Sequence, residues 1–351
     1  MEYSRPLVEL RREHEPRFGG KSTGLGELMA ADIPVPPGFG VSTDAFHAFV
    51  MESGLAGTID AAMARVSADD VDTIMAASQA ISEAMRFAPV PDSVQEEMSR
   101  RYAMLAEATG SDAPPVAVRS SAVGEDGQDA TFAGQQETYL WVRGIDHVCD
   151  ALRDCWVSLF SAPAISYRAR LGPAVAATPA MGVTVQLMVD AAVSGVMFTC
   201  NPVSGDPSMV AINASWGLGL AVVGGEVTPD DLLVSKVTRE VVRESVHCKE
   251  IEYVPDPGGR GVMRVDVPED RRLERCVDER ALAALTDVAR RIERYFGCHQ
   301  DIEWAIARGD DCLFVVQSRP VTAVPKRDKE PTAPTAMSFV MRTFGADRGS
   351  L

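Results

Sequence analysis

Two neighbouring segments near the C-terminal end of the 351-residue chain constrain its fold more than any other feature. Residues 301–306 alternate polar and apolar side chains, residues 308–311 contain a glycine turn, and residues 313–320 return as a second strand-like segment. Alternation on both sides of a loop of about five residues predicts a β-hairpin. We expect Ala307 to pair with Leu313, and this pairing sets the register of the two strands.

This register gathers polar side chains on one face of the predicted hairpin. Glu303 lies opposite Gln317 and Asp301 opposite Arg319, because side chains alternate between the two faces. The other face holds the apolar side chains of Ile302, Trp304, Ile306, Phe314 and Val316. An acid, an amide and an arginine on one face suit a metal-bound phosphate. A solvated face with an ordinary Asp–Arg pair is an equal alternative from the pattern alone.

Composition limits the function classes that need to be considered. The chain is 46% hydrophobic and 24% charged, which is typical of a globular protein with two or three structural units. Its net charge of −16 argues against partners such as nucleic acid or an anionic membrane surface. There is no signal peptide and no apolar run of about 18 residues, so we expect a cytoplasmic protein. Seven scattered cysteines without a CxxC pair predict reduced thiols rather than a zinc site.

A glycine pair precedes a lysine near the N-terminus. Gly19 and Gly20 come directly before Lys21, and a helical apolar pattern follows. Backbone N–H groups and an ammonium group at the start of a helix suit an anion. The spacing is not that of a Walker A loop. Taken alone, this stretch favours a glycine turn carrying a surface lysine over an anion site.

An arginine at the end of an apolar strand is the next candidate. Residues 116–122 predict a buried strand that carries Arg119, and the Gly-rich polar residues 124–136 predict a long loop. Arginine beside such a loop suits a phosphate clamp, although a structural salt bridge fits as well. Elsewhere the pattern predicts helices in 55–110 with a break at Pro89–Pro91, and single helices over 146–171 and 270–296.

Six motifs then occur in a fixed order along the chain. They are GGK at 19–21, VRSSA at 118–122 with DATFAGQQET at 129–138, SGVMFTCNP at 194–202, ASWGLG at 214–219, TPDD at 228–231, and QDIEW at 300–304 with VVQSRPVT at 315–322. Together they resemble the nucleotide-binding domain of the phosphoenolpyruvate synthase and pyruvate phosphate dikinase family, which rifampin phosphotransferases share. The resemblance covers about residues 15–324.

This resemblance implies an α+β ATP-grasp fold in which two lobes close on ATP. Residues 1–185 would form the N-terminal lobe, with a helical scaffold and a loop that covers the phosphates. Residues 186–324 would form the C-terminal lobe with the metal-binding hairpin, and 325–351 a linker and partner-docking tail. The implied cofactors are ATP and Mg²⁺, and the implied chemistry is phosphoryl transfer, which depends on positioning and charge neutralisation.

The family's functional residues map onto matching positions here. The resemblance implies that Lys21 and Arg119 contact the phosphates and that Arg319 stands beside the metal-binding pair, so these three are the catalytic candidates. It implies that Glu303 and Gln317 bind the metal. The remaining nucleotide-binding candidates are Thr131, Gly134 and Gln135 over the phosphates, and Gln186, Met188 and Val189 around the adenine.

The family also uses a phosphohistidine in a Gly-Gly-x-x-x-His-Ala setting, and none of the five histidines lies in that context. We therefore expect an ATP-binding subunit similar to that of phenylphosphate synthase, with a partner subunit that carries the histidine domain and the acceptor site. Its products would be an aryl phosphate, AMP and phosphate. The alternatives are the ATP-grasp part of a pyruvate- or rifampin-phosphorylating enzyme, and a nucleotide-binding regulatory module without turnover.

Overall fold

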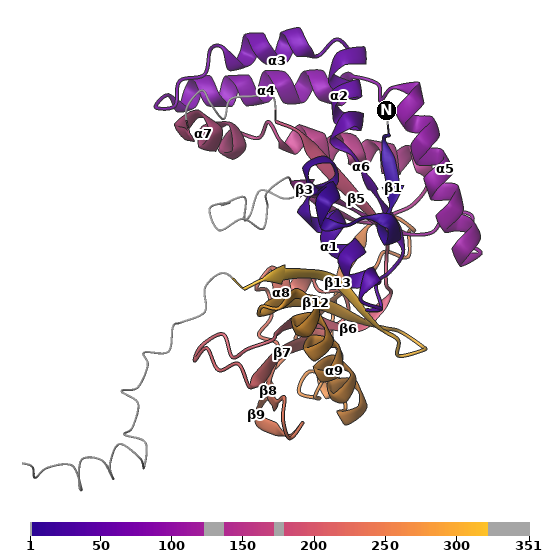
Figure 1. The fold of residues 1–351 in the computed structure, drawn as a ribbon, viewed down its shortest axis with the longest axis vertical. Helices are drawn as coiled ribbons and strands as arrows, with labels where there is room; N and C mark the ends of the chain where they lie inside the picture. The colour runs from indigo at the N-terminus through magenta and orange to yellow at the C-terminus, as the bar shows by residue number, and fades with distance from the viewer. Residues whose placement is uncertain (1, 123–136, 172–178, 322–351) are drawn as a thin grey trace, which may run out of the picture.

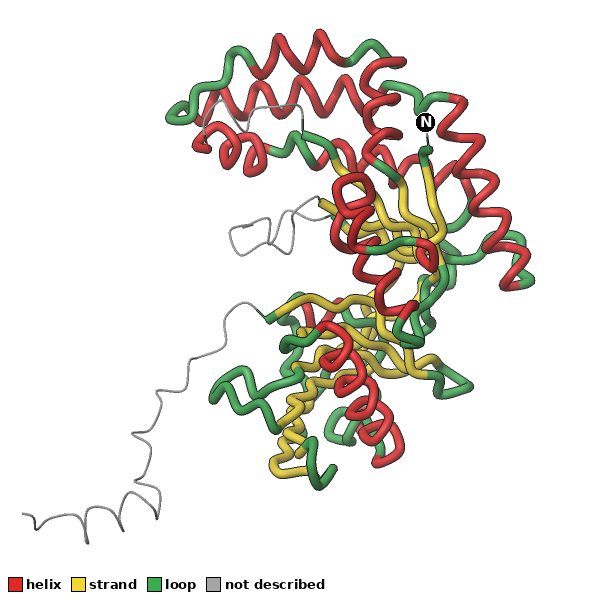
Figure 2. Tube along the Cα trace, viewed as in Figure 1, coloured by secondary structure: helices red, strands yellow, loops and turns green. Residues whose placement is uncertain are grey.

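The computed structural model contains two antiparallel sheets stacked one above the other, each covered by helices (Figure 1). It describes residues 2–122, 137–171 and 179–321. Figure 2 shows that helices gather around the upper sheet, whereas strands dominate the lower part of the molecule. We call the upper part the N-terminal lobe and the lower part the C-terminal lobe.

The N-terminal lobe is built on a five-stranded sheet in the order β1-β2-β5-β3-β4. Its strands are β1 (Ser4–Pro6), β2 (Gly38–Val41), β3 (Val116–Ala122), β4 (Thr138–Val142) and β5 (Met181–Leu187). The helices of this lobe are α2 (Thr43–Glu52), α3 (Ala56–Met63), α4 (Val71–Phe87), α5 (Asp92–Thr109), α6 (Ile145–Ser158) and α7 (Ala162–Leu171). Apolar side chains from α2–α6 and from β2, β3 and β5 form one buried core.

Local signals explain where these helices begin and end. Asp70 caps α4 by accepting hydrogen bonds from the Asp72 and Thr73 amides, and α5 stops at Gly110 in the left-handed conformation. The helices predicted within 55–110 are confirmed, with the break at Pro89–Pro91. The single helix predicted over 146–171 is wrong, because α6 and α7 are separate. Pro163 lies in the first turn of α7, since proline cannot supply the N–H that a helix interior requires.

The C-terminal lobe is built on a six-stranded sheet in the order β13-β12-β6-β7-β8-β9. Its strands are β6 (Ala191–Phe198), β7 (Met209–Trp216), β8 (Asp230–Ser235), β9 (Val241–Ser245), β12 (Gln300–Ala307) and β13 (Leu313–Pro320). A separate hairpin joins β10 (Ile251–Pro255) to β11 (Val262–Asp266), and the helices are α8 (Leu220–Val223) and α9 (Glu279–Phe296). Among the described residues, the 3₁₀ turns η1 (Leu7–Glu9) and η2 (Arg12–His14) come before α1 near the N-terminus, and η3 (Glu269–Arg271) comes before α9. The helix predicted over 270–296 begins later, at Glu279, because Asp278 caps it.

Helix α1 (Glu15–Ala30) lies between the two sheets and contacts β3 and β5 above and β13 below. Its path breaks at Gly19, where φ is 78°, and a Cβ built there would meet the Ser121 carbonyl oxygen at 2.1 Å. Only glycine fits this position. Leu25 and Leu28 of α1, with Leu7 and Leu10 before it, belong to the core of the C-terminal lobe. The N-terminal residues therefore stabilise both lobes.

The predicted hairpin is present, and its polar face has the expected register. Glu303 pairs with Gln317 and Asp301 with Arg319. A bulge after Glu303 shifts the pairing, so that Ile306 rather than Ala307 lies opposite Leu313. An extra residue reverses the alternation of side chains beyond it. The prediction that Phe314 and Val316 face the core is therefore wrong, and Val315, which is fully buried, takes that role.

Candidate functional site

A cavity of about 240 Å³ lies between the two lobes. The sheet of the N-terminal lobe contributes Ala117, Arg119, Thr138, Leu140, Gln186 and Leu187 to its lining. The C-terminal lobe contributes Ala191, Ser194, Gly195, Leu218, Gly219, Leu220, Val223, Glu303, Trp304, Ala305 and Val316, and the connection between the sheets contributes Met188 and Val189. One end is apolar, and the other holds a charged pair. This arrangement suits a ligand with a flat apolar part and an anionic part.

Arg119 crosses from the N-terminal lobe to the polar face of the β12–β13 hairpin. Its Nη2 donates to Gln317 Oε1 at 2.6 Å and to Glu303 Oε2 at 3.3 Å, and its Nη1 donates to the Val316 carbonyl at 3.1 Å. The Arg119 side chain is 12% exposed and that of Glu303 is 27% exposed. The tertiary structure thus joins three predicted site residues that are far apart in sequence. The two oxygens that Arg119 contacts are of the kind that bind hard cations.

Lys21 lies next to β3, the strand that carries Arg119. Its side chain is buried, and Nζ donates to the carbonyl of Ser120 at 3.0 Å, directly beside Arg119 in β3. The neighbouring Ser22 hydroxyl bonds the Thr184 hydroxyl at 2.7 Å and so ties this turn to β5. The alternative of a surface lysine is therefore wrong. Lys21 does not line the cavity itself.

The connection between the lobes supplies the apolar end of the cavity. Gln186 is buried and donates from Nε2 to the Pro36 carbonyl at 3.2 Å. The backbone amide of Met188 donates to Pro115 O at 2.9 Å. These bonds fix the segment that ends β5 and continues through Val189. All three predicted adenine-binding residues lie at this cavity.

Arg319 and Asp301 form a second pair on the polar face of the hairpin. Arg319 Nε donates to Asp301 Oδ2 at 2.8 Å, and the Asp301 side chain is only 13% exposed. Burial raises the pKa of Asp301, while the adjacent Arg319 lowers it. Side-chain alternation had placed Asp301 on this face, but we assigned it no site role from the sequence.

The side chains of the site supply oxygen donors for the predicted Mg²⁺. In the part of the chain that the structure describes, no group of three or more His, Cys, Asp or Glu side chains could hold a metal ion. Mg²⁺ is commonly bound by one or two protein oxygens together with phosphate oxygens. Glu303 and Gln317 fit that pattern. The predicted phosphate-covering residues Thr131, Gly134 and Gln135 lie outside the described residues.

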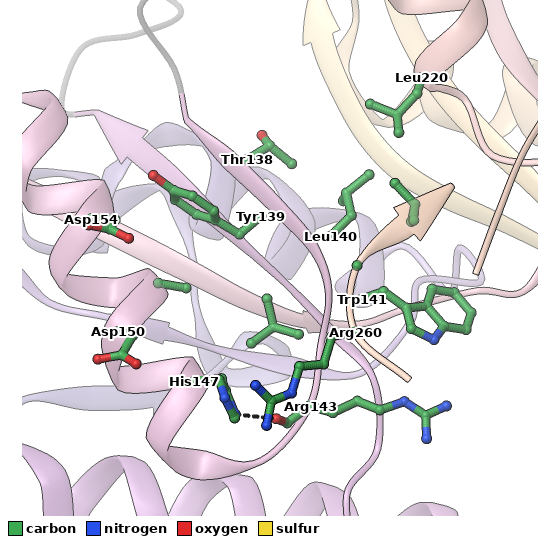
Figure 3. A pocket seen from close by; sticks show the side chains of 14 residues that line it. Thr138, Tyr139, Leu140, Trp141, Arg143, His147, Asp150, Asp154, Leu220 and Arg260 are labelled. Carbon is green, nitrogen blue, oxygen red and sulfur yellow. Dashed lines mark hydrogen bonds between the residues drawn. The ribbon is translucent and has the colours of Figure 1, made fainter. Parts of the chain in front are cut away.

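A larger groove of about 480 Å³ lies beside β4, at the tip of the β10–β11 hairpin (Figure 3). Its charged side chains have mixed signs. Asp150 pairs with Arg153 at 2.7 Å, and His147 Nδ1 bonds the Arg143 carbonyl at 3.0 Å. None of the predicted site residues lines this groove. Among the described residues, no helix is long and apolar enough to cross a membrane.

Residues 15–338 match the family model of the pyruvate phosphate dikinase AMP/ATP-binding domain. The chain belongs to this family. It is 36% identical to a probable phosphoenolpyruvate synthase of Pyrococcus abyssi over 97% of the chain and 46% of that protein. It is 37% identical to a probable phosphoenolpyruvate synthase of Methanothermobacter thermautotrophicus over 97% of the chain and 49% of that protein. The phosphoenolpyruvate synthase of Pyrococcus furiosus is 36% identical over 97% of the chain and 46% of its own length.

The family predicted from the motifs is thus confirmed, and its domain is of the ATP-grasp type, consistent with the mixed α+β structure. The chain spans about half the length of the curated relatives it matches first.

Proposed function

We propose that this chain binds Mg²⁺–ATP between its lobes and serves as the nucleotide-binding part of a dikinase-type phosphotransferase. The observation that carries the proposal is the contact of Arg119 with Glu303 and Gln317 beside the interlobe cavity. In this proposal, the pair that would bind the cation and the arginine that would bind phosphate come from different lobes and meet beside the cavity. The family match supports the same conclusion.

Each side chain has a role that its chemistry allows. Arg119 and Arg319 would neutralise phosphate oxygens, and Glu303 and Gln317 would hold Mg²⁺. Lys21 does not line the cavity and donates to the Ser120 carbonyl, so it would have to leave that bond to reach a phosphate. The metal would supply charge neutralisation on the phosphates. Gln186, Met188 and Val189 would surround the adenine at the apolar end. Thr131, Gly134 and Gln135 stay proposed as the cover over the phosphates.

The lobe boundaries and the tail are part of this proposal. β5 ends at Leu187 and β6 begins at Ala191, so we place the junction of the lobes at 188–190 rather than at the expected 185/186. We keep 325–351 as a candidate docking tail for the protein that carries the phosphohistidine. That protein would be a partner subunit.

The names of the relatives favour pyruvate as the acceptor over the phenolic acceptor that we expected from the sequence. With pyruvate the balanced reaction is pyruvate, ATP and water giving phosphoenolpyruvate, AMP and phosphate. A phenol would give an aryl phosphate with the same two nucleotide-derived products.

Calorimetric titration of the full chain with ATP tests the binding step. We expect saturable binding that weakens about tenfold or more when EDTA replaces Mg²⁺, because the phosphate charge then loses its counter-ion. GTP is the matched control for the base. A chain that takes up no ATP under either condition would overturn the proposal.

Turnover is tested by adding a histidine-carrying partner protein together with pyruvate or, in a parallel reaction, phenol. AMP and phosphate in equal amounts support a dikinase. The acceptor that becomes phosphorylated shows whether the substrate is pyruvate or a phenol. Formation of ADP as the sole nucleotide product would rule out the dikinase reaction.

A further inference from the structure

Trp141 adopts a backbone conformation that a bulky residue rarely takes. Its φ is 58°, in the left-handed region. In the described part of the chain, the other non-glycine residues with positive φ are Asp32, Arg239 and Asp311. Trp141 differs from them because it lies inside a strand and is only 5% exposed. Such a conformation persists only where the surrounding structure fixes it.

A bulge in β4 accounts for this conformation. Val142 pairs with Val116 and Tyr139 with Val118, so Leu140 and Trp141 together lie opposite Ala117. Leu140 lines the interlobe cavity, whereas Trp141 does not. Both side chains line the groove beside β4, and Leu140 also reaches the interlobe cavity.

The Trp141 side chain is part of a small buried cluster behind the apolar end of that cavity. The cluster also contains Ala191, Leu218 and Ala305, and Met188 and Val189 pack against it. All five of these residues line the cavity. The indole therefore supports the wall that the adenine would contact, without contacting the nucleotide itself.

The C-terminal lobe reaches Trp141 through the β10–β11 hairpin. The Gly261 amide donates to the Trp141 carbonyl at 3.3 Å, and Tyr253 and Val262 pack against the same cluster. Tyr253 O in turn accepts from the Leu218 amide at 2.9 Å, which ties the hairpin to the cavity wall. Figure 3 shows the Trp141 ring beside the hairpin segment that follows Arg260. Trp141, in the N-terminal lobe, therefore contacts both the β10–β11 hairpin and the cavity wall of the C-terminal lobe.

We propose that Trp141 is a positioning residue that sets nucleotide affinity by holding the cavity wall and the β10–β11 hairpin in one arrangement. The proposal rests on the proposed ATP-binding function and adds to it a residue that lies outside the six motifs described above. Because Trp141 acts through Leu218, Met188 and Val189, its removal should weaken binding of the base rather than of the phosphates.

Three substitutions separate the ring from the backbone. Trp141→Phe keeps an aromatic ring, Trp141→Ala removes it, and Trp141→Gly removes it while relieving the positive φ. We expect ATP and adenosine affinity to fall about tenfold in both small variants and less than threefold in Trp141→Phe. Trp141→Gly should melt at a higher temperature than Trp141→Ala although the two bind equally weakly. Inorganic triphosphate, which lacks the base, should bind all four proteins alike.

Val262→Ala tests the hairpin side of the contact, and Met263→Ala, at a half-exposed position of the same strand, is its control. We expect Val262→Ala to weaken ATP binding in the same direction as Trp141→Ala, with Met263→Ala unchanged. In turnover assays with the complete partner system, the Trp141 variants should raise KM for ATP more than they lower kcat.

Intrinsic fluorescence gives a readout that a merely structural role would not move. The chain has four tryptophans, so the difference between wild type and Trp141→Phe isolates the signal of this one. We expect ATP to change that signal. Variants that bind ATP and adenosine like wild type, with only a lower melting temperature, would overturn the inference. Wild-type protein that binds no ATP would instead overturn the proposed function.

Discussion

Arg119 makes the contacts on which the proposed site depends. Its guanidinium bonds the Glu303 carboxylate and the Gln317 amide, and both of these side chains are partly exposed. Water can therefore hydrate them when the arginine is removed. Substitution should therefore cost function more than folding.

For Arg119→Ala we expect turnover to fall about 10²- to 10³-fold, because a preorganised donor to developing phosphate charge is lost. Unfolding free energy should change by less than about 1 kcal/mol, as for other partly exposed ion pairs. Arg119→Lys is the matched variant, and it should recover only part of the rate because it cannot make two parallel hydrogen bonds. Initial-rate measurements and urea denaturation check both expectations, and a variant that is unfolded by circular dichroism would contradict them.

Cys149 on α6 gives a prediction for alkaline pH. Burial raises the pKa of this thiol from 9.0 to about 11. The folded protein then keeps a proton that the unfolded chain releases, so this contribution to stability is complete below pH 9 and is lost as pH rises through 11. The loss is at most about 1.4 kcal/mol per pH unit. The difference in unfolding free energy between wild type and Cys149→Ala should fall over that window, and parallel pH profiles would contradict the prediction.

At the scale of elements, a buried ion pair holds the C-terminal lobe together. Asp230, at the start of β8, accepts from Lys249 Nζ at 2.5 Å and from the His247 amide at 3.1 Å. Its second oxygen accepts from the Cys276 amide at 2.8 Å. Both charged side chains are fully buried. This carboxylate connects β8 to the segments before β10 and before α9.

We expect Lys249→Met to destabilise the protein by about 3–5 kcal/mol, because the Asp230 carboxylate stays buried without its counter-charge. The double variant with Asp230→Asn should lose less than the single one. Arg243→Ala, which breaks the exposed Arg243–Asp231 pair between β8 and β9, should cost about 1 kcal/mol or less. Equal losses for Lys249→Met and Arg243→Ala in urea titrations would count against this assignment.

At the scale of the whole molecule, the two lobes have separate cores but share α1 and the interlobe cavity. A ligand that contacts both lobes should therefore stabilise the molecule as a unit.

At about 100 times its dissociation constant, Mg²⁺–ATP should stabilise the folded chain by about 2.7 kcal/mol. For lobes of this size the melting temperature should rise by roughly 5 °C. EDTA or the Arg119→Ala substitution should remove most of that rise. If calorimetry resolves two unfolding transitions and Mg²⁺–ATP raises the temperature of only one, the nucleotide is held by a single lobe.

Some of this architecture could be predicted from local patterns. The polar face of the β12–β13 hairpin follows from side-chain alternation, which depends on neighbouring residues only. The bulge after Glu303 could not be predicted, because it depends on how β13 pairs with β12 in the folded sheet. The break between α6 and α7 had a visible signal in Pro163, which the periodic pattern obscured.

The sequence by itself determined the family, the order of the motifs and the polar face that carries Glu303 and Gln317, because each depends on residue type and short spacing. Only the tertiary structure decided that Arg119 contacts that face, that Lys21 is buried, and that Trp141 supports the cavity wall. Those contacts join residues 99 or more positions apart or from different lobes, and no local pattern specifies which distant surfaces meet when the sheets pack.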